Sequence, residues 1–440
     1  MTDTIFALAS APGRGAVQII RISGPEAGNA LATLTGKPLP PARQAALTAL
    51  HDPVGGEVMD RALLLWFPTP SSFTGEDVAE LHLHGGRAVL SAVTAALAGL
   101  GLRVAEPGEF SRRAFENGKL DLTEAEAIAD LVEAETAAQR RQALRQMQGE
   151  LGRLYEDWRS RLVRALAHLE ADIDFPDEDL PESVAPAVRP VLESLAAEIG
   201  AHLDDGHRGE RLRDGVSIAI LGAPNAGKSS LLNAIARRDV AIVSARAGTT
   251  RDVIEAYLDL GGFPVVLADT AGLRDAADEI EQEGIRRARA RAEAADLKLL
   301  VFDAGTGPDA ETLALAGGDA LLVLNKADLL TSPAPAGVGG HPAIVVSAAS
   351  GEGLPSLLSA LQSRVAELVT GSGAPPLTRA RHRAALEECR AALLRALAAP
   401  LPELAAEDVR LAARALGRIT GRVDVEDLLD VIFRDFCIGK

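Results

Sequence analysis

The stretch GAPNAGKS, residues 222–229, matches the phosphate-binding loop pattern G-x-x-x-x-G-K-[ST] at every fixed position. The apolar run GVSIAILG leads into it and SSLLNAIA follows it, which predicts a strand, a glycine-rich turn and a helix. The backbone N–H groups of such a turn and the N-terminus of such a helix bind phosphate groups. We therefore expect Lys228 to reach the β- and γ-phosphates of a nucleotide and Ser229 to bind Mg²⁺.

Three further segments indicate which nucleotide the loop binds. DTAG, residues 269–272, follows FPVVLA, and its aspartate and Gly272 N–H suit the magnesium shell and the γ-phosphate. NKAD, residues 325–328, follows ALLVLN, and the Asp328 carboxylate suits the N1–H and 2-amino group of guanine. Adenine has an acceptor at N1 and no 2-amino group. SAAS, residues 347–350, can cap the guanine carbonyl with its backbone, so the ordered set is similar to the translation-factor-like GTPases.

The residues expected to bind GTP lie in these four segments and in SARAGTTRD, residues 244–252. They are Asn225, Ala226, Gly227, Lys228, Ser229, Ser230, Ser244, Ala245, Arg246, Ala247, Gly248, Thr249, Thr250, Asp269, Thr270, Ala271, Gly272, Asn325, Lys326, Ala327, Asp328, Ser347, Ala348 and Ala349.

The residue after DTAG is Leu273, where many small GTPases carry a glutamine that orients water. Leucine cannot orient water, so hydrolysis requires another group, and Glu281 and Glu283 are both candidates. The amide oxygen of Asn225 can ligate a monovalent cation beside the phosphates. A cation there would neutralise developing charge as an arginine finger does.

Composition bounds the rest of the chain. Its 440 residues correspond to roughly three domains. No apolar run has the ~18 residues of a membrane span, and the N-terminus lacks the pattern of a signal peptide. The two cysteines cannot form a disulfide framework, so we expect a cytoplasmic protein. The formal net charge of −17 argues against non-specific coating of nucleic acid, although local arginine clusters occur.

The fold class expected is multi-domain, combining α+β and α/β parts. Residues 1–118 are punctuated by glycine and proline and read as an α+β domain. Residues 119–212 read as the first part of a helical domain, which begins with a capping box of Thr123 and Glu126. Residues 213–370 alternate strand-like and helix-like segments, as in a parallel α/β domain. Residues 371–440 are helical again, so the α/β domain is inserted into a discontinuous helical domain.

Several segments together resemble the MnmE (TrmE) family of tRNA-modifying GTPases. They are PGRGAVQIIRISG, SFTGEDVAEL, HGG, PGEFSRRAFENGKLDLTEAEAIADL, the GTPase segments and the final CIGK. The resemblance covers the chain from about Thr4 to Lys440. It implies an N-terminal dimerising domain that binds a tetrahydrofolate (5-formyl- or 5,10-methylene-), a discontinuous helical domain and an inserted G domain. It also implies a homodimer, a flavoprotein partner, MnmG (GidA), in a heterotetramer or larger assembly, and a tRNA substrate. The chemistry implied is addition of a carboxymethylaminomethyl or aminomethyl group to carbon 5 of the wobble uridine.

The resemblance also carries site residues. It implies K⁺ ligation by Asn225, Ser244, Arg246 and Thr249, and Mg²⁺ ligation by Ser229 and Thr250. It favours Glu281 over Glu283 as the catalytic glutamate. It implies folate contacts at Arg21, Glu80, Lys119 and Lys440, with Glu76 as the competitor for Glu80.

The segment DFCIGK raises the remaining question. Cys437 is either a nucleophile toward uridine carbon 6, a group that stabilises one-carbon transfer, or a small buried apolar side chain. Other functions stay open too: a ribosome-assembly GTPase that acts as a switch without chemistry of its own, or a helical scaffold that binds GTP. His82 and His84 share one strand face, but two ligands make a poor metal site.

Overall fold

The computed structural model describes residues 3–174, 184–237, 255–269, 294–371, 375–423, 426–434 and 436–439. The chain divides into two compact units. Unit 1 comprises Met1–Ala129, Met147–Arg164 and Arg410–Lys440, and unit 2 comprises Asp130–Gln146 and Ala165–Val409. This division passes through two long helices, α6 (Glu150–Asp174) and α14 (Pro402–Thr420). The domain boundaries expected from the sequence therefore stay a prediction.

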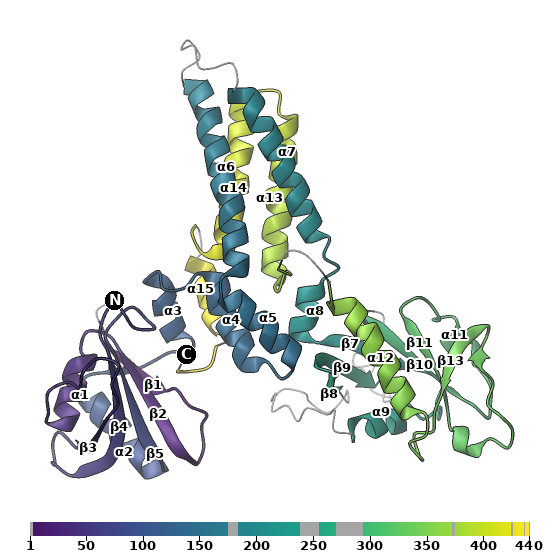
Figure 1. Cartoon of the computed structure of the whole chain (residues 1–440), viewed down its shortest axis with the longest axis horizontal. Helices are drawn as coiled ribbons and strands as arrows, with labels where there is room; N and C mark the ends of the chain where they lie inside the picture. The colour runs from purple at the N-terminus through teal and green to yellow at the C-terminus, as the bar shows by residue number, and fades with distance from the viewer. Residues whose placement is uncertain are drawn as a thin grey trace, which may run out of the picture. The chain divides into compact units, whose positions relative to one another are not determined.

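Unit 1 is built on a six-stranded sheet with the strand order β3-β4-β5-β2-β1-β6. The strands are β1 (Ile5–Leu8), β2 (Gly15–Ser23), β3 (Ala46–His51), β4 (Val58–Phe67), β5 (Val78–Gly85) and β6 (Arg103–Val104). Neighbours run antiparallel except β1 and β6. α1 (Ala27–Thr35) and α2 (Arg87–Gly99) cover one face of the sheet (Figure 1). Side chains alternate between the faces, so Ile20, Ile22 and Leu81 are buried against these helices, whereas Arg21 and Glu80 lie on the other face.

The helices of unit 1 connect this sheet to the end of the chain. α3 (Glu109–Glu116) contacts α15 (Glu426–Arg434), and α4 (Leu122–Glu133) follows α3. A small apolar cluster of Leu122, Ala125, Leu429, Phe433 and Phe436 joins α4 to α15. The final helix is therefore anchored by packing.

The capping box of α4 differs from the expected one by two residues. The Asp121 carboxylate accepts from the Glu124 N–H at 2.9 Å, and the Glu124 carboxylate accepts from the Asp121 N–H at 2.8 Å. The prediction of Thr123 and Glu126 was wrong because both residues are buried inside the helix, whereas Asp121 precedes its first turn.

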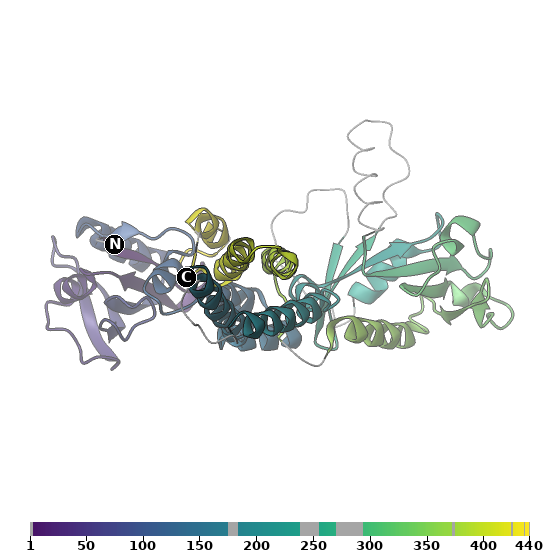
Figure 2. The same cartoon turned by 90° about the horizontal axis from the view of Figure 1, so that it is seen from above.

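Unit 2 contains helices and an α/β segment. α5 (Ala137–Met147) is short, whereas α7 (Val184–Leu203) and α13 (Ala380–Ala398) are long and pack side by side (Figures 1 and 2). α8 (Arg208–Asp214) leads from α7 into the α/β segment. Among the described residues, no helix is both long and apolar enough to cross a membrane.

The α/β segment is a seven-stranded sheet with the strand order β12-β13-β11-β10-β7-β9-β8. The strands are β7 (Val216–Leu221), β8 (Glu255–Leu260), β9 (Phe263–Asp269), β10 (Leu297–Asp303), β11 (Ala320–Asn325), β12 (Gly337–Val338) and β13 (His341–Val345). The five inner strands run parallel, as the sequence predicted, and β8 and β12 are antiparallel edges.

Helices complete the α/β segment. α9 (Lys228–Ala236) and α12 (Leu354–Val369) bury their leucines against the sheet, and α11 (Ala310–Leu313) places Leu313 in a separate apolar cluster. The parallel strands end together, which brings their carboxyl-end loops to one edge of the sheet, where ligands bind in such folds.

Candidate functional site

The phosphate-binding loop lies between β7 and α9. Asn225 and Gly227 both have left-handed backbone conformations, with φ of 62° and 90°. A Cβ at Gly227 would lie 2.3 Å from Asn325 Nδ2, so only glycine permits this approach. Lys228 is buried, and its Nζ donates to the carbonyls of Gly222 and Ala223 at 3.0 and 2.9 Å. The ammonium is thus aimed into the ring of the loop.

Asn325 ties the three nucleotide segments together. Its side chain is 1% exposed. Its Nδ2 donates to the Ala226 carbonyl of the loop at 3.0 Å, and its Oδ1 accepts from the Ala348 N–H of SAAS at 3.0 Å. The segments GAPNAGKS, NKAD and SAAS therefore form one site, although up to 99 positions separate the bonded residues.

Asp328 carries the carboxylate expected to recognise guanine. It lies in the short helix η2 (Ala327–Leu329) and is exposed. Ser347 Oγ donates to Asp328 Oδ1, and the Ser350 N–H donates to Ser347 Oγ. These bonds orient the carboxylate and leave its other oxygen available for a base.

The ion pair between Asp303 and Lys326 was not predicted from the sequence. Lys326 has a φ of 65°, and its Nζ lies 2.8 Å from Asp303 Oδ2. The hydrogen bond from Lys326 holds the pKa of Asp303 below its ordinary value. Asp303 ends β10 directly opposite Asn325 at the end of β11. Only the strand register brings them together, although an aspartate at the end of the run LKLLVFD was a usable signal.

Part of the predicted GTP site lies outside the described residues. This holds for Ser244, Ala245, Arg246, Ala247, Gly248, Thr249, Thr250, Thr270, Ala271, Gly272 and Glu281, and for Lys440 of the folate set. The backbone of Asp269 is described as the last residue of β9. Ser229 lies in the first turn of α9, next to Lys228, where a hydroxyl suits a magnesium ion.

The folate residues expected in unit 1 fall into two places. Arg21 donates to Glu80 Oε1 through Nε at 3.0 Å and Nη2 at 2.9 Å. Its guanidinium carbon lies 5.4 and 5.7 Å from the ring centroids of Phe73 and Phe110. Lys119 Nζ instead donates to the Pro70 carbonyl at 2.9 Å. Arg21 thus lies over two aromatic rings, and one of them, Phe110, is buried in the core.

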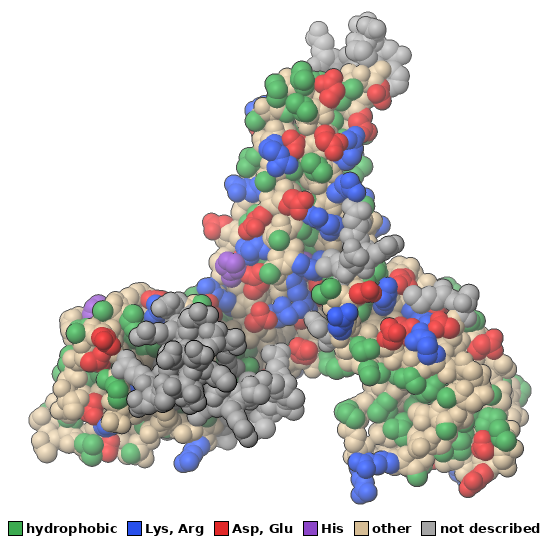
Figure 3. Space-filling view, turned by 180° about the vertical axis from the view of Figure 1, so that it is seen from behind, with side chains coloured by type: hydrophobic (Ala, Val, Ile, Leu, Met, Phe, Trp, Pro, Cys, Tyr) green, Lys and Arg blue, Asp and Glu red, His purple; other side chains and the backbone are tan. Residues whose placement is uncertain are grey.

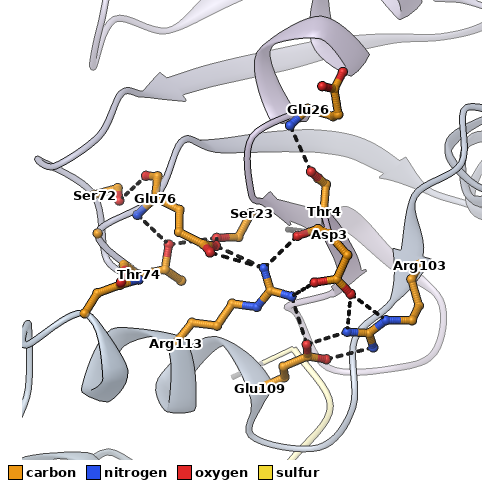
Figure 4. A network of polar contacts seen from close by, with 12 residues as sticks. Asp3, Thr4, Ser23, Glu26, Ser72, Thr74, Glu76, Arg103, Glu109 and Arg113 are labelled. Atoms are coloured by element: carbon orange, nitrogen blue, oxygen red, sulfur yellow. Dashed lines mark hydrogen bonds and ion pairs between the residues drawn. The ribbon is translucent and has the colours of Figure 1, made fainter. Parts of the chain in front are cut away.

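Glu76, the competitor for Glu80, belongs to a polar network around Arg113 (Figure 4). Arg113 is 1% exposed and donates to the carboxylates of Asp3, Glu76 and Glu109. Ser23 Oγ also donates to Glu76, at 2.7 Å. Glu76 is thus committed to a buried arginine, which favours Glu80 as the folate residue.

Glu109 is a buried carboxyl in this network, and burial alone would raise its pKa. The hydrogen bonds from Arg103, the Glu106 N–H and Arg113 outweigh burial, so the pKa of Glu109 lies below its ordinary value. Ion pairs from Arg103 and Arg113 to Asp3 therefore fix the start of the chain on the sheet.

The C-terminal tail lies along the loop before α3. Ile438 pairs with Pro107, and the Gly108 N–H donates to the Cys437 carbonyl at 3.4 Å. Gly439 is buried with a φ of 99°, and a Cβ there would lie 2.2 Å from the Leu8 carbonyl oxygen. The glycine thus allows the tail to touch the end of β1.

The two cysteines have different surroundings. Cys389 is buried in α13, and burial raises its pKa to about 12, so it is inert. Cys437 is exposed, which is not the environment of a packing side chain. The interpretation of Cys437 as a buried apolar group therefore finds no support in its exposure.

Of the two histidines of β5, His84 is hydrogen-bonded to a carboxylate, whereas His82 Nε2 only lies near one without a hydrogen bond. His84 Nδ1 lies 2.7 Å from Asp60, and His82 Nε2 lies 3.5 Å from Glu80. Within the part of the chain that the structure describes, no group of three or more ligand side chains could hold a metal ion.

Comparison with known proteins identifies the family. The family model described as "MnmE helical domain" matches residues 122–437, and that described as "GTP-binding protein TrmE N-terminus" matches residues 4–119. A protein of Paramagnetospirillum magneticum named tRNA modification GTPase MnmE is 62% identical over 442 residues, covering 100% of both chains. A protein of Parvibaculum lavamentivorans with the same name is 59% identical over 443 residues, again covering 100% of both.

Among solved structures, the G domain of the T. maritima FeoB iron transporter is 23% identical, with a TM-score of 0.24, and the match covers 35% of this chain and 99% of that chain. A TM-score this low supports no conclusion about the present chain. The two full-length relatives and the two family models, which together span almost every residue, are sufficient without it: the chain belongs to the MnmE family of tRNA modification GTPases.

Proposed function

We propose that this protein is a GTPase that takes part in tRNA modification, with GTP and Mg²⁺ bound in the α/β segment. The observation that carries the proposal is the pair of hydrogen bonds by which Asn325 joins the phosphate-binding loop to the guanine-binding segments. Family membership supports the same activity.

The domain assignment that goes with this proposal has four segments. Residues 1–118 form a dimerisation and tetrahydrofolate-binding domain, residues 119–212 and 371–440 form the helical domain, and residues 213–370 form the GTPase domain. The α/β segment, which runs from β7 to α12, supports the assignment of residues 213–370 to the GTPase domain.

The reaction proposed is addition of a carboxymethylaminomethyl or aminomethyl group to carbon 5 of the wobble uridine. A tetrahydrofolate supplies the one-carbon unit, and a flavoprotein partner, MnmG, supplies the redox chemistry. Arg21 and Glu80 would hold the folate, because their paired charged groups are partly exposed and can meet the polar groups of such a ligand. Lys119 and Lys440 complete the proposed set.

Cys437 is proposed to act near this site. Its thiol is exposed at the tail, which is held to unit 1 at Pro107 and Leu8. An exposed cysteine can act as a nucleophile once it is deprotonated. Whether it attacks uridine carbon 6 or stabilises one-carbon transfer is an open choice between two chemical roles.

Potassium is proposed as the cation that assists hydrolysis, with Asn225, Ser244, Arg246 and Thr249 as its ligands. The backbone of Asn225 supports this proposal, because its left-handed φ of 62° is uncommon for a residue other than glycine and occurs at the residue proposed to ligate the cation. Mg²⁺ is assigned to Ser229 and Thr250, and Glu281 to activation of water.

The charge of the chain bears on how tRNA is bound. On the face seen in Figure 3, Lys and Arg side chains alternate with Asp and Glu side chains along the long helices. Ion pairs on the long helices include Arg189 with Glu193 and Arg395 with Asp408. With a net charge of −17, we propose that the partner protein supplies most of the basic surface for tRNA.

The test is mass analysis of wobble-uridine nucleosides from cells that lack this protein. Loss of the carbon-5 modification, restored by the wild-type chain, supports the proposal. Normal nucleosides together with defective ribosome assembly would instead favour a switch that acts on ribosomes.

A further inference from the structure

The hairpin of β8 and β9 is attached to α5 at its turn. The Ala138 N–H donates to the Gly262 carbonyl at 3.0 Å. On its other side the turn meets α12, since a Cβ at Gly261 would lie 2.1 Å from Gln362 Nε2. The turn is therefore held between two helices, and a displacement of the hairpin must move at least one contact.

The opposite end of the same hairpin belongs to the proposed GTP site. β9 ends at Asp269, the first residue of DTAG, and β8 begins at Glu255, shortly after SARAGTTRD, residues 244–252. β9 also pairs with β7, which leads into the phosphate-binding loop. The β8–β9 hairpin thus connects the proposed nucleotide-binding segments SARAGTTRD and DTAG to α5.

A second connection joins α4 and α5 to the strand that carries the loop. Gln139 Nε2 donates to the carbonyl of Arg213, which precedes β7, at 2.9 Å. Asp130 Oδ1, near the end of α4, accepts from Arg213 Nε at 3.2 Å and from Arg379 Nη2 at 2.7 Å. Arg213 lies where the chain enters the α/β segment, and Arg379 lies where the chain has left it. These two positions are the crossings, and the largely buried Asp130 carboxylate is bonded to both.

The two crossings also touch each other. A Cβ at Gly209 would lie 2.1 Å from the Leu377 carbonyl, and the Leu377 N–H donates to Asp205 at 3.3 Å. The crossings therefore move together, and the Asp130 carboxylate is the group that couples them to α4.

The joint, which is the region where α4 and α5 meet Arg213 and the β8–β9 hairpin, is not close-packed. A cavity of about 40 Å³ lies at it, lined by Asp130, Arg213 and residues of α4, α5, β8 and β9. Its polar lining and size give room for a few water molecules. Glu133 and Glu135 also face the cavity, so Arg213 has other carboxylates within the same space. A polar joint with free volume and alternative partners can adopt two arrangements, whereas a close-packed one resists change.

We propose that the β8–β9 hairpin and the Asp130 clamp, which is Asp130 bonded to Arg213 and Arg379, relay the nucleotide state of the α/β segment to α4 and α5. Asp130 is the positioning residue. The inference rests on the proposed GTP site, because the relay begins at the segments assigned there. A nucleotide acts on the helices only if the two arrangements bind it with different affinity, as in any coupled pair of sites.

The test is hydrogen exchange of the full-length chain with GDP and with a non-hydrolysable GTP analogue. We expect amides 137–147 and the hairpin turn to exchange differently in the two states. In Asp130→Asn, the carboxylate loses its charge and its ion pairs with Arg213 and Arg379, so the nucleotide-dependent difference in exchange of α4 and α5 should be lost. Both nucleotides should still bind.

The matched control is Asp408→Asn, which removes the ion pair with Arg395 on long helices away from this joint and should leave the response unchanged. Should Asp130→Asn fail to fold, Arg213→Gln and Arg379→Gln each test one arm, and either should weaken the response. An unchanged response in a folded clamp variant overturns the proposal.

The two failures are distinguishable. Identical exchange of 137–147 in both states, with altered exchange at the phosphate-binding loop, sinks the relay and leaves the GTP site standing. No change at the loop with either nucleotide sinks the proposed GTP site itself.

Discussion

Recognition of guanine over other nucleotide bases is expected to rest on the carboxylate of Asp328. Its replacement in Asp328→Asn should weaken GTP binding by about 3 kcal/mol, because two charge-assisted hydrogen bonds to guanine are lost. The bond from Ser347 can persist with the amide oxygen, so the loop itself should keep its shape. Nucleotide titration measures the affinity, and xanthosine triphosphate should bind the variant better than it binds wild type. An unchanged affinity for GTP would remove the guanine assignment.

Water activation is assigned to Glu281, which lies outside the described residues. A positioned general base typically contributes about 10²–10⁴-fold to a rate. Glu281→Ala should therefore lose most GTP turnover and keep nucleotide affinity. Glu283→Ala is the matched control and should remain active; the reverse outcome would show that the assignment is displaced by two residues.

Contiguous motifs made much of the GTP site predictable at the scale of single residues. The loop, NKAD and SAAS were recognised because each motif carries its own chemistry. The partners of Asn325 and Asp303 were not, since 99 and 23 positions separate the bonded residues. Glu76 and Glu80 could not be separated by pattern alone, because the groups that commit Glu76, Ser23 and Arg113, lie 53 and 37 positions away.

At the scale of elements, the end of α7 contains a buried histidine that makes stability depend on pH. Burial lowers the pKa of His202 to about 4 from 6.5. The folded state therefore binds this proton less readily than the unfolded state. The free energy of unfolding is therefore highest above pH 6.5, where His202 is neutral in both states, and it decreases as the pH falls from 6.5 toward 4, where only the unfolded state binds the proton readily.

Between pH 7 and pH 5 the His202 contribution should fall by about 2 kcal/mol. Urea unfolding of wild type and His202→Gln at both values measures it. The variant should show the smaller pH dependence, since its side chain does not titrate. Equal dependence in the two proteins would contradict the shift.

The tail element should matter for tRNA modification and not for GTP. Removal of residues 437–440 should abolish modification, because it takes away Cys437, Lys440 and the contact with Leu8, and should leave GTP hydrolysis nearly intact. Nucleoside mass analysis and phosphate release measure the two activities. Survival of modification in the truncated chain would make the tail an ordinary chain end.

Two substitutions resolve the parts of the tail. Gly439→Ala places a Cβ against the Leu8 carbonyl and should displace the tail. Cys437→Ser keeps the tail in place and should lose modification with normal folate binding if the thiol reacts.

Elements were predicted where their pattern is local. GAVQIIRIS is β2, and the strand before the phosphate-binding loop is β7. The start of α4 was misplaced because LDLTEAE contains two overlapping capping boxes, and burial of Thr123 and Glu126 decides between them. The strand order of either sheet was beyond reach, since it depends on pairings between distant segments.

At the scale of the whole molecule, potassium dependence is expected to accompany association of two copies. Asn225→Gly removes the amide ligand, and glycine accepts the left-handed backbone at this position. The GTP hydrolysis rate of wild type should be higher in KCl than in NaCl, and the variant should show no such difference. Sedimentation with GDP and a mimic of the transferred phosphoryl group should show loss of G-domain association in the variant. Equal rates of wild type in both salts would end the potassium hypothesis.

The pairing of α7 with α13 has a consequence for how the chain is made. α7 ends at Leu203 and α13 begins at Ala380, and the whole α/β segment lies between them. A ribosome adding ~5–20 residues per second takes roughly ten to forty seconds to cross that gap. During this time α7 lacks its packing partner α13, and by the end of it the α/β segment has all its strands. The helices therefore close last, so every molecule whose helices have closed has already synthesised its GTP-binding segment in full.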